Sequence, residues 1–266
     1  MTILQAIILG IIEGVTEFLP ISSTGHMILA SKVMGIADTD FLKSFEIIIQ
    51  FGAILSVVVL YWKKIWASQE NFVKIMIAFL PTAVIGFLLY KILKQFLLSS
   101  DVIVLWTLFL GGIVFIVFEI WYKKQSAPKT DGRLFLEYRE IGYKQSFLTG
   151  VWQSLAIIPG VSRSGATIIG GLAMGISREA IVEFSFLLAI PTMAVASGYD
   201  LFKSGANFSG NQFYLLAVGF IVSFLVAILA IKWFINYIKN HSFISFGVYR
   251  IVIAGLFYLL IFQFKV

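Results

Sequence analysis

Six long stretches of apolar residues constrain this sequence more than any other feature. They lie at 45–61, 72–90, 102–122, 180–198, 213–235 and 246–264. An α-helix needs about 20 apolar residues to cross about 30 Å of hydrocarbon, and each stretch approaches or exceeds that length. Only 13% of the 266 residues are charged, whereas soluble domains carry about a quarter. The sequence therefore predicts an all-α, polytopic membrane protein with six membrane-spanning helices.

Two further apolar regions, 3–36 and 146–176, are interrupted by polar residues. The first contains Glu13 and Glu17 ahead of a proline, and the second contains Gln153 ahead of a Pro-Gly pair. Lipid cannot satisfy the main chain at such a break, so the break must be buried in protein or line a water-filled cavity. We expect each region to form a re-entrant helical hairpin that enters and leaves the membrane on the same side.

The two predicted hairpins are related by a shift of 140 residues. The pairs that this shift superposes include Gly10 and Gly150, Glu13 and Gln153, Ser22 and Ser162, and Gly25 and Gly165. We therefore divide the chain into repeat one (1–122), a connector (123–145) and repeat two (146–266), with one hairpin and three spans in each repeat. Three crossings are an odd number, so the repeats are expected to have inverted topology, with their polar breaks meeting near the midplane.

The net charge of +6 comes from basic residues that flank the apolar spans. Such residues mark membrane topology, so we expect no nucleic-acid partner, and the side richer in Lys and Arg is expected to be cytoplasmic. The connector 123–145 lies on that side, which predicts that both termini lie outside. The chain has no cysteine, which excludes disulfides, thiolate metal sites and a cysteine nucleophile.

Ionisable side chains inside the hairpins are the candidate functional groups, because charge at membrane depth is costly and usually marks function. They are Glu13, Glu17, His26 and Arg163. Glu13 and Glu17 are four residues apart and share a helix face, which favours binding of a divalent cation such as Mg²⁺ or Ca²⁺, or acid–base chemistry. The alternative is that Glu13 only satisfies polar main chain. Gln50 and Gln153 are expected to extend the polar lining of the cavity.

The two polar breaks read PISSTGH (20–26) and PGVSRSGAT (159–167). Hydroxyl groups and main-chain N–H groups at a helix N-terminus form a cradle for anions, and the planar fork of an arginine matches phosphate oxygens. The residues predicted to contact phosphate are Ser22, Thr24, Gly25, Ser162, Arg163, Ser164 and Thr167. Two alternatives stay open: the first loop is an ordinary helix cap beside an incidental histidine, and Arg163 pairs with Glu13 or Glu17.

Segments 13–26 (EGVTEFLPISSTGH) and 159–167 (PGVSRSGAT) resemble the two signature segments of the undecaprenyl-diphosphate phosphatase (bacitracin resistance protein) family. The resemblance extends over essentially the whole chain. It implies hydrolysis of undecaprenyl diphosphate to undecaprenyl phosphate and phosphate, which recycles the lipid carrier of cell-wall synthesis and confers bacitracin resistance. It also implies that the protein is a homodimer and that it lies in the bacterial cytoplasmic membrane, in contact with membrane lipids. The family's catalytic residues carry over as Glu13, Glu17, Ser23, His26 and Arg163.

The mechanism and one competing function stay open on the sequence. Either Ser23 attacks the terminal phosphorus while His26 takes its proton, or His26 or a glutamate activates water directly. Ser23 and His26 are three positions apart, about one helical turn, so contact between their side chains is predicted if that turn is helical. A secondary transporter or flippase for a lipid phosphate is the alternative function, because inverted repeats with broken helices are typical of transporters.

Overall fold

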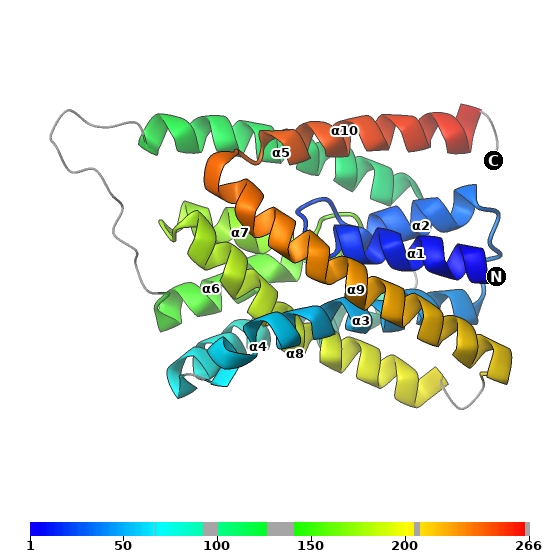
Figure 1. Cartoon of the computed structure of the whole chain (residues 1–266). Helices are drawn as coiled ribbons and strands as arrows, with labels where there is room; N and C mark the ends of the chain where they lie inside the picture. The colour runs from blue at the N-terminus through cyan, green and yellow to red at the C-terminus, as the bar shows by residue number, and fades with distance from the viewer. Residues whose placement is uncertain (67, 93–100, 127–140, 205–207, 264–266) are drawn as a thin grey trace, which may run out of the picture.

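The computed structural model describes all residues except 67, 93–100, 127–140, 205–207 and 264–266. Its elements are helical throughout the part of the chain described (Figure 1). They are α1 (Ile3–Thr16), α2 (Ser23–Val33), α3 (Asp40–Trp66), α4 (Gln69–Ile92), α5 (Asp101–Ser126), α6 (Tyr143–Gln153), the 3-10 helix η2 (Ser154–Ile157), α7 (Arg163–Ala173), α8 (Arg178–Ser204), α9 (Gly210–Asn240), α10 (Ile244–Tyr258) and the π-helix η4 (Leu259–Gln263).

Six of these helices are long and apolar enough to cross a membrane, namely α3, α4, α5, α8, α9 and α10 with its extension η4. Each coincides with one of the six predicted stretches, except that position 264 lies outside the described residues. Large apolar side chains cover their outer faces: Phe87 is 84% exposed and Phe202 is 89% exposed. Such apolar faces suit contact with lipid, and within each helix the main-chain N–H and C=O groups bond to one another. The all-helical, multi-pass prediction is confirmed.

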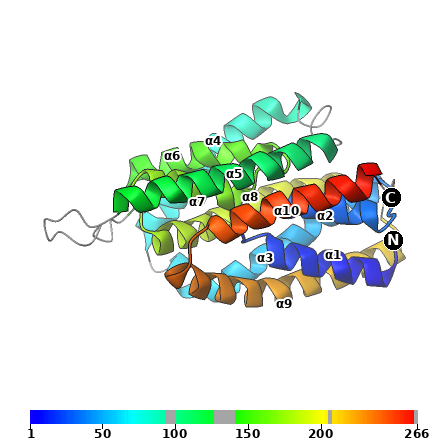
Figure 2. The ribbon, with the colours of Figure 1, turned by 90° about the horizontal axis from the view of Figure 1, so that it is seen from above.

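The four short helices lie in two pairs at opposite ends of the bundle. The pair α1 and α2 occupies one end, and α6 and α7 occupy the other, with the two connecting loops meeting between them (Figure 1). Helix α1 begins at the end opposite to the one where α6 begins, which both views show (Figures 1 and 2). The two loops, 17–22 and 154–162, therefore approach one another from opposite directions.

Each short pair packs against a long helix from the other half of the chain. Helix α1 packs along α9, and α6 packs along α4. Glycines allow this close approach: a Cβ atom on Gly14 would lie 2.7 Å from the Ser223 carbonyl oxygen, and one on Gly150 would collide with the Ala78 carbonyl. Small residues at helix contacts are typical of membrane bundles, where packing replaces the hydrophobic effect as the force between helices. These contacts hold the two loops at the centre.

The predicted connector, 123–145, lies mostly outside the described residues. It joins the last residues of α5 to the first residues of α6, and both of these helix ends lie at the end of the molecule opposite to the first residues of α1 (Figures 1 and 2).

Candidate active site

Two serines give the two loops the same unusual backbone. Ser22 has φ 71° and Ser162 has φ 73°, and they are the only residues other than glycine with positive φ in the described chain. Each serine caps the helix that follows it: Ser22 Oγ accepts a hydrogen bond from Gly25 N at 3.3 Å, and Ser162 Oγ accepts one from Gly165 N at 3.1 Å. Residues that bear a side chain hold positive φ only where their surroundings enforce it, and such positions cluster at functional sites.

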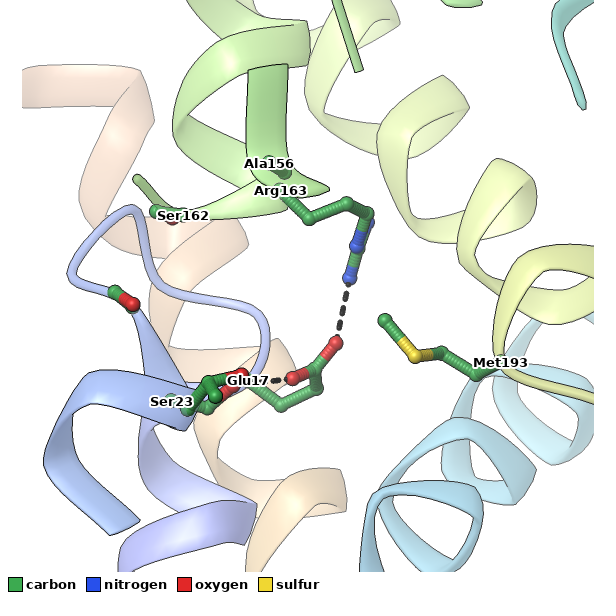
Figure 3. A pocket seen from close by; sticks show the side chains of 8 residues that line it. Glu17, Ser23, Ala156, Ser162, Arg163 and Met193 are labelled. Atoms are coloured by element: carbon green, nitrogen blue, oxygen red, sulfur yellow. Dashed lines mark hydrogen bonds and ion pairs between the residues drawn. The ribbon is translucent and has the colours of Figure 1, made fainter. Parts of the chain in front are cut away.

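A small cavity of about 60 Å³ separates the two loops. Its lining is mainly polar and consists of Glu17, Ser22, Ser23, Thr24, Ala156, Ser162, Arg163 and Met193 (Figure 3). Since about 10–15 Å³ of such volume is enough to hold one water molecule, the cavity has room for a phosphate group. The first turns of α2 and α7 border this space, so two helix N-termini face it, which favours an anion.

Glu17 connects the two loops through its two carboxylate oxygens. Ser23 Oγ donates a hydrogen bond to Oε2 at 2.5 Å, and Arg163 Nη2 lies 3.1 Å from Oε1 (Figure 3). The Glu17 and Arg163 side chains are only 3% and 7% exposed. The predicted pairing of Arg163 with one of the glutamates is thus present, and its partner is Glu17. Chemically, a carboxylate in contact with a serine hydroxyl is placed to remove its proton.

Arg163 is also held from the other side by α8. Its Nη1 donates to the Ser185 carbonyl oxygen at 2.6 Å and to Ser185 Oγ at 3.1 Å. The remaining nitrogen, Nε, is buried and has no hydrogen-bond partner in the described part of the chain. A guanidinium held in place with a spare donor at a polar cavity is suited to bind a phosphate oxygen.

Glu13 lies one helical turn before Glu17 and is completely buried. Neither of its carboxylate oxygens has a hydrogen-bond partner among the described residues. The charged groups that act on it are Glu17, Glu46 and Arg163. A buried carboxylate without a partner requires an explanation, such as a bound ion, and Glu13 is not among the residues that line the cavity. No group of three or more His, Cys, Asp or Glu side chains forms a metal site among the described residues.

His26 lies beside the site but not at the cavity. Its Nδ1 is 2.7 Å from the Ser22 carbonyl oxygen, and its Nε2 is 3.0 Å from the Tyr249 hydroxyl, on whose ring it stacks. The predicted contact between Ser23 and His26 is therefore not formed, although both residues lie in the first turn of α2. The imidazole turns back toward the preceding loop, and the group that contacts the Ser23 hydroxyl is the Glu17 carboxylate.

The other residues predicted to contact phosphate divide into two sets. Thr24 lines the cavity, and Gly25 supplies the N–H group that Ser22 caps. Ser164 and Thr167 are buried behind the cavity: Ser164 Oγ donates to the Leu19 carbonyl at 2.9 Å, and Thr167 Oγ1 donates to Ser185 Oγ at 2.7 Å. Their hydroxyl groups hold the second loop against the first loop and against α8.

Neither glutamine lies at this cavity. Gln153 is buried, and its Nε2 donates to Thr82 Oγ1 at 2.9 Å and to Thr192 Oγ1 at 3.2 Å. Gln50 is buried in α3 and is also absent from the lining. The expected extension of the polar lining to these two residues is not seen at this cavity: Gln153 Nε2 binds hydroxyl groups of α4 and α8, and its buried Oε1 has no hydrogen-bond partner among the described residues.

Two residues of α10, Tyr249 and Arg250, contact the site but are absent from the predicted set. Tyr249 binds His26, and the completely buried Arg250 donates hydrogen bonds to main-chain carbonyls of both loops. The available signal for Arg250 was its position inside an apolar span, where a charged residue usually marks function. Ser185, which holds Arg163, carries no comparable signal, since serine is common in membrane helices.

The fold and the site together define a multi-pass helical membrane protein with an ionisable site where two broken helices meet. The sequence profile described as "Bacitracin resistance protein BacA" matches residues 6–256. This chain belongs to that family.

Curated relatives match this chain over nearly its full length. An undecaprenyl-diphosphatase of Aquifex aeolicus (strain VF5) is 51% identical, with 99% of this chain and 100% of the relative covered. Those of Sulfurihydrogenibium sp. (strain YO3AOP1) and Persephonella marina (strain DSM 14350 / EX-H1) are 50% and 49% identical, with 97% and 98% of this chain and 99% and 100% of the relatives covered.

Proposed function

We propose that this protein hydrolyses undecaprenyl diphosphate to undecaprenyl phosphate and inorganic phosphate. The reaction recycles the lipid carrier of cell-wall synthesis in the bacterial cytoplasmic membrane and confers bacitracin resistance. Membership of the bacitracin resistance family and the named activity of the relatives support the substrate. The observation that carries the proposal is the contact of Ser23, Glu17 and Arg163 in one phosphate-sized cavity.

The terminal phosphate binds between the N-termini of α2 and α7. Main-chain N–H groups and the positive ends of both helix dipoles favour its negative charge. Arg163 Nε supplies a free donor, and Nη2 exchanges the Glu17 carboxylate for a phosphate oxygen. This exchange frees Glu17 from its ion pair with Arg163, so substrate binding itself releases the base. The isoprenoid tail stays in the bilayer, because the lining of the cavity is mainly polar.

Ser23 is the proposed nucleophile and Glu17 is its base. As Ser23 Oγ forms a bond to the terminal phosphorus, its proton passes to Glu17 Oε2, 2.5 Å away. The bond from that phosphorus to the bridging oxygen breaks, and undecaprenyl phosphate leaves as an anion. Glu17 returns this proton to the departing undecaprenyl phosphate and is a carboxylate again. It then removes a proton from the water that attacks the phosphoserine, and this proton passes to Ser23 Oγ as the bond from phosphorus to Oγ breaks and inorganic phosphate leaves. Phosphoryl transfer depends mainly on positioning and on charge stabilisation, which Arg163 and the helix N-termini supply.

A divalent cation, Mg²⁺ or Ca²⁺, is proposed to bind Glu13 and Glu17. The unpartnered carboxylate of Glu13 supports this assignment. Two carboxylates are enough, because Mg²⁺ usually keeps several waters and binds one or two carboxylates together with substrate phosphates. When bound, the ion would offset charge on the diphosphate.

We also propose that the halves 1–122 and 146–266 are inverted repeats, each with a re-entrant hairpin (3–36 and 146–176), joined by a cytoplasmic connector. Three observations support this: the matching backbone of Ser22 and Ser162, the opposite directions of α1 and α6, and the packing of each short pair on the other half. Both termini then lie outside. The homodimer that the resemblance implies stays part of this proposal.

The deciding experiment measures phosphate release from undecaprenyl diphosphate by the purified protein in detergent, with and without chelator. We expect turnover without any membrane gradient, loss of turnover in Ser23→Ala, and a decrease with chelator. A protein that binds the lipid phosphate and moves it across vesicles, but releases no phosphate in detergent, would be a flippase instead.

A further inference from the structure

Arg250 lies in the middle of α10, yet its side chain is completely buried. A charged group at this depth is costly and is usually paired. None of the ion pairs in the described chain includes Arg250. The position of this arginine therefore needs an explanation other than a salt bridge.

The guanidinium group of Arg250 donates only to main-chain carbonyls. Its Nε donates to Leu108 at 3.3 Å, Nη1 to Pro20 and Val161 at 3.3 Å each, and Nη2 to Thr107 at 2.9 Å and Gly160 at 2.8 Å. An arginine has five N–H donors in a rigid plane, and here five acceptors surround it. They belong to three separate segments: the first loop, the second loop and α5.

The carbonyls from the loops lie directly before the two serines that have positive φ. Pro20 is two residues before Ser22, and Gly160 is two residues before Ser162. Such a backbone persists only where surrounding contacts impose it. One rigid group therefore sets the path of both loops just ahead of the cavity, with α5 as its fixed support.

We infer that Arg250 is a positioning residue that holds the two cavity loops in register. It keeps Glu17, which begins the first loop, and Ser23, which follows it, opposite Arg163, which follows the second loop. The inference rests on the proposed phosphatase function for its kinetic test. Lysine cannot replace arginine here, because a single ammonium group lacks the planar fork that reaches three segments.

Gly111 on α5 offers a second way to disturb the same group without changing Arg250. A Cβ atom on Gly111 would collide with Arg250 Nη2 and lie 2.8 Å from Cζ. Gly111→Ala must therefore push the guanidinium away from its carbonyls, while α5 itself tolerates alanine well. Gly255→Ala in α10 is the matched control, since nothing lies within 4 Å of a Cβ atom there. Arg178→Lys is the control for losing a half-buried, paired arginine, because Arg178 pairs with Glu119 and does not line the cavity.

The experiment compares kcat and KM for undecaprenyl diphosphate in Arg250→Lys, Gly111→Ala and the two controls, at temperatures well below the Tm of each variant. We expect kcat to fall about 100-fold in both test variants, which is the cost of displacing catalytic groups by about 1 Å. The KM should change much less, and the controls should keep wild-type kcat. Wild-type kcat in either test variant, or a loss that disappears on further cooling below Tm, overturns the inference.

A second readout does not depend on activity. The chain has no cysteine, so cysteines placed at Thr24, in the first turn of α2, and at Ala156, in the second loop, give a clean distance probe across the cavity that both residues line. A short bifunctional thiol reagent should cross-link this pair in the parent background and much less after Arg250→Lys or Gly111→Ala. A cross-linking yield that the two substitutions leave unchanged overturns the positioning role. If the yield falls but the wild-type protein releases no phosphate, only the proposed function is overturned.

Discussion

Replacing Glu17 with glutamine tests the centre of the site. Gln has nearly the same shape, so Ser23 keeps a hydrogen-bond acceptor, but the residue loses both its charge and its capacity as a base. Loss of a general base lowers the rate by about 10²–10⁴-fold. The substitution also leaves the buried Arg163 without its carboxylate, 3.1 Å away, and breaking a buried ion pair costs about 3–5 kcal/mol. We expect the lower end, about 3 kcal/mol, because Ser185 still holds Arg163.

Glu119→Gln separates the two effects. Glu119 is completely buried and pairs with Arg178, far from the cavity lining. This control should lose a similar free energy of unfolding while it keeps wild-type kcat. The assays are phosphate release in detergent and unfolding monitored on the same preparations. A Glu17→Gln enzyme that keeps kcat within about tenfold of wild type would refute the role of Glu17 as a base.

The other predictions concern the arginine, the histidine, the cation and the topology. Arg163→Lys keeps the charge but loses the fork that binds Glu17 and Ser185 together, so phosphate release should fall by orders of magnitude with an intact fold. Tyr249→Phe removes the hydroxyl that holds His26 Nε2, and the kcat should fall only several-fold, because His26 does not contact Ser23; a loss as large as that of Ser23→Ala would restore His26 as the base. Glu13→Gln should abolish the response of the rate to added Mg²⁺ or Ca²⁺, and an unchanged response would remove Glu13 from the cation site. A reporter fused after Val266 should signal the outside, whereas an internal signal would contradict the inverted repeats.

The membrane spans and the identity of the ionisable residues could be predicted from the sequence, because the physical constraint acts on each segment separately. The thickness of the hydrocarbon sets the length of 102–122 whatever packs against it. The cost of charge at membrane depth requires Glu17 and Arg163 to be buried in protein wherever the hairpins lie. The repeat of 140 residues likewise predicts that Ser22 and Ser162 occupy matching positions, and the two φ values agree.

The partners of these groups were decided only by the tertiary structure. The spacing of Ser23 and His26 predicts a shared helix face. In the structure, however, the loop places the Glu17 carboxylate, and not the His26 imidazole, in hydrogen-bond contact with the Ser23 hydroxyl. Arg250 is the clearest case: its acceptors at Pro20 and Gly160 are 230 and 90 positions away. A hydropathy pattern reports the solvent around one segment, whereas a hydrogen bond requires two atoms to lie about 3 Å apart. Residues so distant in the chain reach that separation only when α10, α5 and both loops are packed together.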